Sequence, residues 1–233
     1  MKLSTISLLL GASMTSQLAF AQDIDIKVQN LSQGLYFTPL VIAAHNDSGY
    51  LFELGQSASG ELQAMAEGGD ISGLVNIANS IGANVIENPA AGLLAPAAHT
   101  SASVMTTDGN MYLSVSAMIL PSNDGFVGLD RWPIPAAAGT YHIYLNAYDA
   151  GTEANNELVV DGSGAPGVLG IPAAPGMDAG SGGSGVTSTE QNTMVHVHRG
   201  NLGDDDLTSG HSDLDNTVHR WLNPVAKLTV TVK

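Results

Sequence analysis

Two acidic stretches of this sequence contain the side chains that could bind a metal ion. The first, NDGFVGLDRWPIP at 123–135, contains Asp124 and Asp130, and the second, YDAGTEANNE at 148–157, contains Asp149 and Glu153. Both are rich in glycine and in oxygen-bearing side chains, so we expect two loops rather than packed strands. Calcium takes about six to eight oxygen ligands from carboxylates, carbonyls and water. Two such loops at adjacent strand ends could supply them.

The glycines within these stretches could bring the acids together. Gly128 precedes Asp130 and permits an unusual turn, and Gly151 lets the chain curl so that Glu153 returns toward the same ion. Asp124 either binds this ion or only braces its own turn. The residues alone leave open a pair of solvated acidic loops, because carboxylates held close without a cation repel one another. Magnesium fits less well, since it requires tight octahedral geometry.

Other polar groups offer weaker candidates. His196 and His198 share one face of an alternating strand, and with His219 they could bind zinc or copper, although ordinary hydrogen bonding is the simpler interpretation. A later acidic segment offers either a second cation site or a solvated loop. Its acids are Asp204, Asp205, Asp206, Asp213 and Asp215.

The sequence lacks the motifs of the common hydrolases. It contains no GxSxG, no HExxH, no phosphate-binding glycine loop and no cysteine. Paired carboxylates could still cleave glycosides, with Trp132 and Trp221 as sugar platforms. We therefore expect a non-catalytic protein, with a carbohydrate-binding or carbohydrate-hydrolysing envelope protein as the alternative.

The N-terminus predicts export. Lys2 precedes an apolar run at 6–10, and Ala19 and Ala21 form an A-x-A pattern, so residues 1–21 are expected to be a cleaved signal peptide. The mature chain, 22–233, is expected to be secreted or periplasmic and to contain no transmembrane segment. Its partner is expected to be a surface or matrix ligand, protein or glycan. Nucleic acid is disfavoured by 22 Asp and Glu against seven Lys and Arg.

These candidate sites need a β-rich scaffold to position them. Alternating or β-branched runs at 24–31, 99–107, 111–120, 140–148, 193–200 and 223–233 predict short strands, with a hairpin turn at 108–110. Ser59 and the apolar spacing after it predict one or two short helices over about 59–80, packed across an end or edge of the strands. Residues 161–190 are Gly- and Pro-rich and predict an irregular, flexible excursion within one domain.

With these elements placed, the chain resembles the spondin N-terminal domain of F-spondin and mindin. The resemblance is carried by PSNDGFVGLD at 121–130, Trp132 and YDAGTEANNE at 148–157, and it extends over roughly 25–160, with QGLYFTPLVIAAH and ASGELQAMAEGGD also similar. It implies an antiparallel β-sandwich with a calcium ion bound by loop carboxylates, here Asp130, Asp149 and Glu153, with Asp124 as a further ligand. It also implies a secreted adhesion or matrix role. The chain lacks the cysteines of the animal domains, so their partners are not carried over.

Overall fold

The computed structural model describes residues 21–233 except 166, 178 and 207. The predicted signal peptide therefore lies outside the described residues, apart from Ala21. The elements are β1 (Asp23–Asn30), β2 (Tyr36–Phe37), β3 (Val41–His45), α1 (Gly60–Gly68), α2 (Ser72–Ser80), β4 (Asn84–Glu87), β5 (His99–Met105), β6 (Tyr112–Leu120), β7 (Gly125–Pro133), β8 (Gly139–Asp149), β9 (His196–Val197) and β10 (Ala226–Val232).

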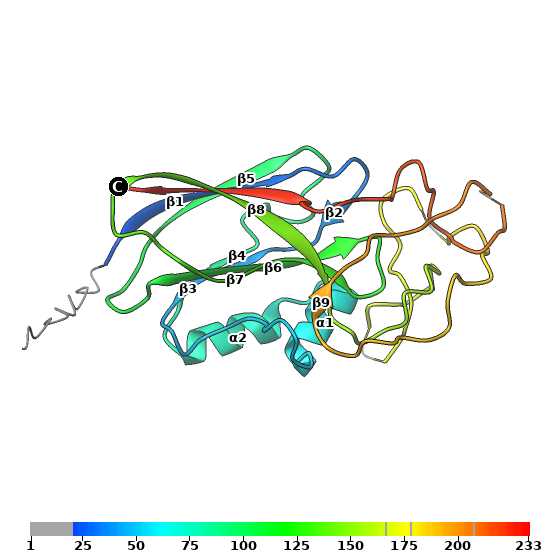
Figure 1. The fold of residues 1–233 in the computed structure, drawn as a ribbon, viewed down its shortest axis with the longest axis horizontal. Helices are drawn as coiled ribbons and strands as arrows, with labels where there is room; N and C mark the ends of the chain where they lie inside the picture. The colour runs from blue at the N-terminus through cyan, green and yellow to red at the C-terminus, as the bar shows by residue number, and fades with distance from the viewer. Residues whose placement is uncertain (1–20, 166, 178, 207) are drawn as a thin grey trace, which may run out of the picture.

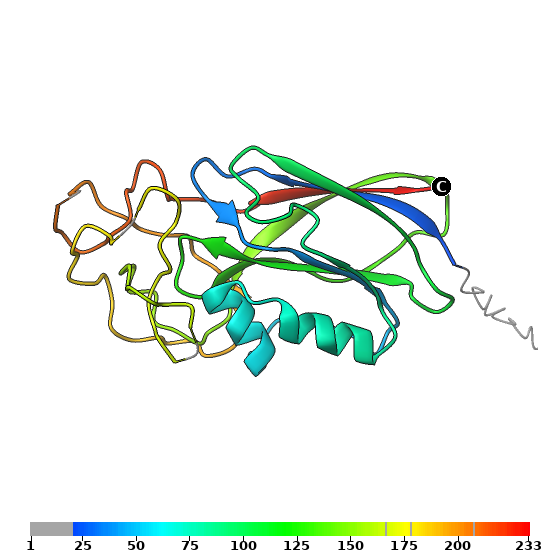
Figure 2. The same cartoon turned by 180° about the vertical axis from the view of Figure 1, so that it is seen from behind.

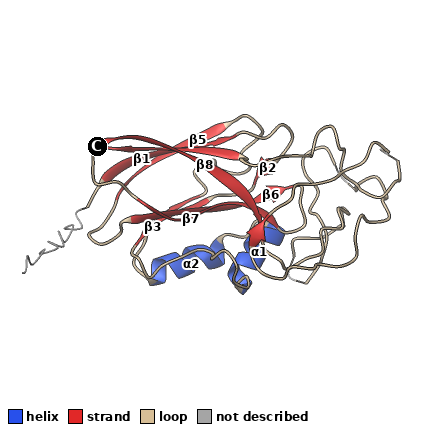
Figure 3. Ribbon diagram, in the orientation of Figure 1, coloured by secondary structure: helices blue, strands red, loops and turns tan. Residues whose placement is uncertain are grey.

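The strands form one antiparallel sheet that folds into two facing layers (Figures 1 and 3). The order is β4-β3-β6-β7-β8-β10-β1-β5, with β2 added to β6 and β9 to β8. The long strand β8 belongs to both layers, because its first part pairs with β10 and its last residues pair with β7. This arrangement confirms the predicted antiparallel β-sandwich.

The two layers enclose the main core. Strands β1 and β10 alternate strictly between buried and more exposed residues, so that Ile24, Ile26 and Val28 meet Leu228 and Val230 inside. Burying each such side chain is worth about 1.5–3 kcal/mol. The outward residues of these strands are polar, as the sequence pattern predicted.

A second core lies under the helices. Strands β3 and β6 are buried on both faces, and α1 and α2 cover the outer face of their layer (Figure 2). Ser59 begins α1 by accepting the Leu62 N–H at 3.1 Å, as predicted. The helices pack on a face of the sandwich rather than across an end or edge, because an apolar two-sided strand needs cover on both sides.

The expectation of a loop at 123–135 is wrong, since Gly125–Pro133 form β7. Glycine there serves packing rather than a turn. A Cβ on Gly128 would lie 2.7 Å from the ring of Phe52, so only glycine lets this ring pack against the strand. The chain turns instead at 121–124, immediately before the strand.

The predicted hairpin at 108–110 is also wrong, although the chain does turn there, with the Asn110 N–H bonded to Thr107 O. Strand β5 pairs with β1 and strand β6 with β3 and β7, so the two strands that flank the turn lie in different layers. A local turn signal does not specify whether its flanking strands pair.

Beyond the ends of β6 and β8, the described residues between β8 and β10 form long loops at one end of the sandwich, interrupted by the short strand β9 (Figure 1). The Gly-rich segment is irregular, as predicted, and it is anchored. Ile171 is fully buried, and Asp213 accepts the backbone N–H groups of Val159, Ser181 and Gly183. A search of the described residues for a helix able to cross a membrane finds none.

Candidate metal centre

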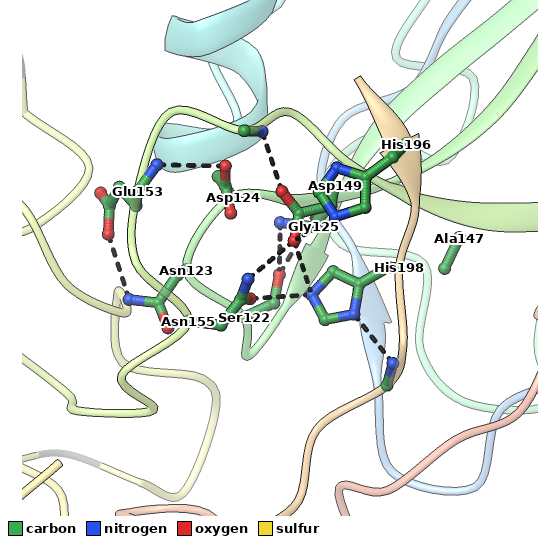
Figure 4. A network of polar contacts seen from close by, with 12 residues as sticks. Ser122, Asn123, Asp124, Gly125, Ala147, Asp149, Glu153, Asn155, His196 and His198 are labelled. Carbon is green, nitrogen blue, oxygen red and sulfur yellow. Dashed lines mark hydrogen bonds and ion pairs between the residues drawn. The ribbon is translucent and has the colours of Figure 1, made fainter. Parts of the chain in front are cut away.

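The sheet register brings two strand ends together at one end of the sandwich. Gly125 at the start of β7 pairs with Asp149 at the end of β8, so Asp124 stands beside the end of its neighbour strand. Ser122 fixes the turn before β7, because its hydroxyl accepts the Gly125 N–H at 3.1 Å. Figure 4 shows the polar network that results.

Asp124 binds the loop that follows β8. Its Oδ2 accepts the backbone N–H groups of Thr152 at 2.8 Å and Glu153 at 3.2 Å. The side chain is 0% exposed, and its other oxygen, Oδ1, has no hydrogen-bond partner. The sequence left open whether Asp124 braces a turn or binds an ion. In the structure Oδ2 braces the loop, and Oδ1 is left without a partner.

Glu153, like Asp124, has one carboxylate oxygen that accepts hydrogen bonds and one that has no partner. Its Oε2 accepts the side-chain amide of Asn123 at 3.1 Å and the backbone N–H of Gly170 at 3.0 Å, whereas the buried Oε1 has no partner. Gly151 allows the loop to return, with a φ of 71°. A Cβ there would lie 2.6 Å from the Thr193 carbonyl carbon, so glycine is required.

Asp149 completes the group of acids. Its Oδ1 accepts the Gly151 N–H at 2.8 Å, and its Oδ2 accepts the Asn155 amide at 2.7 Å. His196 and His198 each place Nε2 at 3.8 Å from this Oδ2. Asp149 and Glu153 both lie near enough to Asp124 for their charges to raise its pKa, and we call these three residues the strand-end acids.

Burial makes the charged forms of these acids costly. It raises the pKa of Asp124 to about 7, with the nearby charge of Asp149 adding to the effect. Burial also raises the pKa of Glu153 to about 7. The pKa of Asp149 is raised by burial as well, although bonds from Asn155 and Gly151 oppose the rise.

Asp130 does not join the strand-end acids. It lies on β7 six residues after Asp124, a separation of roughly 20 Å along a strand. Its Oδ1 lies 3.2 Å from Nε of Arg131, whose guanidinium also approaches Glu53 at 3.5 Å. The structure therefore does not bring Asp130 together with Asp149 and Glu153, because the assumed loop is a strand.

The histidines are placed differently from a three-imidazole metal site. His198 accepts the Gly200 N–H at Nδ1 and donates from Nε2 to Asn155 Oδ1 at 3.0 Å, so both ring nitrogens are occupied. Burial lowers its pKa to about 3. His219 lies in another loop, where its Nδ1 accepts the Asp215 N–H at 3.1 Å.

In the later acidic segment, carboxylates accept hydrogen bonds from nearby backbone N–H groups. Asp204 Oδ2 accepts the N–H groups of Ser212 and His211. These two bonds lower the pKa of Asp204, and the bond from Ser212 has the larger effect. Asp206 caps the turn at Thr208 in the same way. Asp204 and Asp206 are therefore engaged by their own backbone, whereas Asp205 is exposed.

The sequence analysis missed the polar partners of the strand-end acids. Asn123, Asn155 and His198 are all less than 5% exposed, and Gly170 reaches Glu153 from the Gly-rich segment. Asn123 and Asn155 could have been found from the sequence, because each lies within one of the two acidic stretches. Gly170 could not be found from the sequence, because nothing local marks a backbone donor seventeen residues away.

The strand-end acids fit a hard divalent cation. Two buried carboxylate oxygens without a partner, Asp124 Oδ1 and Glu153 Oε1, are the kind of ligand that calcium takes. Among the described residues, no three His, Cys, Asp or Glu side chains are placed so that they could hold a metal ion together. A cation bound here would need backbone carbonyls or water beside the carboxylates. A cation here would lower the free-energy cost of three buried negative charges.

Comparison with known proteins gives one positive finding. A family model described as Spondin_N matches residues 16–158, a span that contains both acidic stretches and all three strand-end acids. No match is found among curated proteins.

Proposed function

The chain belongs to the Spondin_N family, and on that premise we propose that it is a non-catalytic calcium-binding module that acts in cell-surface or matrix interactions. Family membership indicates an extracellular type of domain. The observation that supports calcium is the pair of unpartnered, buried oxygens on Asp124 and Glu153. Asp149 is the third proposed ligand. The ion would tie the end of β8 to the turn before β7, and so stabilise the loops that present the binding surface.

The module is proposed to be exported, in line with the predicted signal peptide, and to remain periplasmic or leave the cell. Its ligand is a protein or a glycan. The carbohydrate-hydrolysing alternative has less support, because the strand-end acids are no more than 3% exposed and leave no room for a sugar ring. Trp221 is buried against His198, with ring centroids 4.9 Å apart, and Trp132 packs on Tyr141. Neither offers an open platform.

Calorimetry and thermal unfolding with calcium, magnesium or chelator test the proposal. A ligand that binds only the folded state stabilises it by mass action, by about 2.7 kcal/mol at a hundredfold excess over its Kd. Extracellular modules bind calcium with Kd values of about 0.1–1 mM, so a smaller gain is expected at millimolar calcium. Calcium should raise the Tm more than equal magnesium does.

Two variants make this test specific. Asp149→Ala should abolish most of the calcium response, whereas Asp205→Ala, an exposed acid of the later segment, should leave it intact. No heat of binding, together with a Tm that is the same in chelator and in calcium, would show that the acids are a buried polar network without an ion.

A further inference from the structure

One face of the sandwich is bare. Helices α1 and α2 cover the layer of β3, β6 and β7, whereas no described element covers the outer face of β5, β1, β10 and β8 (Figures 2 and 3). The outward residues of these four strands are exposed or half-buried, and they alternate with the buried residues of the main core. This face is therefore open to a partner.

Two neighbouring rows of side chains cross the four strands of this face. Strand register places Ser101, Lys27, Thr229 and His142 in the first row. The second row contains His99, Gln29, Lys227 and Tyr144. We call these two rows the lysine face.

The lysine face contains cations in a strongly acidic chain. The whole sequence has 22 Asp and Glu against seven Lys and Arg, yet neither row contains a carboxylate. All three lysines of the described residues, Lys27, Lys227 and Lys233, project from this side of the sandwich. Lys233 is paired with Asp23 and Asp25 at 3.2 and 2.8 Å, whereas Lys27 and Lys227 make no ion pair with any described residue.

The surface around the lysines is polar and slightly hollowed. A depression of 440 Å³ is lined by Lys27, Ser101 and Thr229 of the first row and by Asp25, Ser103 and Thr231 of the row beyond it. The carboxylate of Asp25 is paired with Lys233 at 2.8 Å. The two unpaired lysines are diagonal neighbours on adjacent strands, with Cβ atoms roughly 7–8 Å apart. Hydroxyl, amide and imidazole groups surround them, and these can exchange hydrogen bonds with sugar hydroxyls.

We propose that the lysine face binds an acidic polysaccharide, with Lys27 and Lys227 pairing with its carboxylates and the neighbouring polar side chains bonding its hydroxyls. A thin polymer can lie along the rows and stay clear of the acidic end of the molecule. A nucleic acid or an anionic membrane would extend beyond the face and meet the net charge of −15. A second copy could offer its later acidic segment, but Asp204 and Asp213 there are engaged by their own backbone.

Binding of labelled polygalacturonate, measured in calcium-free buffer at low salt with neutral dextran as the comparison polymer, tests the proposal. The double variant Lys27→Gln/Lys227→Gln should bind about tenfold more weakly than the unmodified protein. Arg199→Gln/Arg220→Gln is the matched control, because it changes the net charge equally at exposed positions off this face. It should bind within about twofold of the unmodified protein.

Several results would overturn the proposal. These are no binding of polygalacturonate at low salt, equal binding of dextran, or equal losses in the two double variants, which would reflect net charge alone. Self-association that the lysine variant abolishes, with polymer binding unchanged, would identify a second copy as the occupant. Because the binding is measured in calcium-free buffer, this result is independent of whether the strand-end acids bind calcium.

Discussion

Replacing Asp124 by Asn should stabilise the protein in chelator and should remove the further stabilisation that calcium gives to the unmodified protein. The amide oxygen of Asn can still accept the N–H groups of Thr152 and Glu153. Its NH2 group would take the place of the unpartnered Oδ1, close to the charges of Asp149 and Glu153. The substitution therefore keeps the loop bonds and removes only the buried charge.

The magnitude follows from the pKa. A rise from 3.8 to about 7 corresponds to a cost of about 4 kcal/mol for the charged carboxylate in the folded state. Because the folded pKa is raised, the stabilising contribution of Asp124 is fully present below its unfolded pKa and is lost as the pH rises through about 7. At pH 8 without metal, Asp124→Asn should therefore increase the free energy of unfolding by about half of this cost, or about 2 kcal/mol. For a domain of this size, that raises the Tm by about 4–8 °C.

Thermal unfolding at pH 8 and pH 5, each with chelator and with calcium, measures these effects. At pH 5 the advantage of Asp124→Asn in chelator should be clearly smaller than at pH 8, because folded Asp124 is then protonated and only the unfolded chain carries its charge. In calcium at pH 8 the unmodified protein should gain stability and the variant should not. Asp205→Asn is the control, because this exposed acid should change nothing under any condition. A variant that is less stable than the unmodified protein in chelator at pH 8, or that shows the same shift at both pH values, would refute the reasoning.

Three further predictions concern other parts of the chain. Asp130→Asn should leave the heat of calcium binding unchanged, because Asp130 lies beside Arg131 and away from the strand-end acids; a lost response would contradict the placement of this residue. Asp213→Ala should cost about 1–3 kcal/mol and speed protease cleavage within 161–190, since it removes the acceptor of three backbone N–H groups; unchanged cleavage would show that the segment is held by other contacts. Mass spectrometry of the exported protein should find Gln22 at the N-terminus, and a chain that starts at Met1 would exclude signal cleavage.

The strands that the sequence predicted well are those with one buried face. In β1 and β10 the alternation of apolar and polar residues is the direct consequence of packing against the core on one side and water on the other. The same logic predicted α1, whose start at Ser59 depends on a local side-chain cap. Each of these signals is contained within a few consecutive residues.

The elements that were mispredicted depend on distant partners. Strand β7 contains two glycines and ends in acidic and aromatic residues, and only the ring of Phe52 explains why Gly128 belongs in a strand. This one error also misplaced Asp130, because a residue on a loop can fold back toward Asp149 and a residue on an extended strand cannot. Likewise, pairing of β5 with β1 rather than β6 is decided by the core and not by the turn between them.

The local density of acids was a poor guide to where a cation would bind. The later acidic segment has more carboxylates than the strand ends, yet Asp213 accepts four hydrogen bonds and its pKa is lowered because the bonds from Gly183, Val159 and Ser181 outweigh burial. Asp124 accepts bonds at one oxygen only, and burial raises its pKa. A buried carboxylate whose oxygens are filled by backbone N–H groups is already compensated, whereas one with an oxygen left over needs a proton or a cation. What distinguishes the proposed calcium site from the later acidic segment is therefore that two neighbouring buried acids, Asp124 and Glu153, each keep an unfilled oxygen, whereas the unfilled Oδ1 of Asp130 lies beside Arg131.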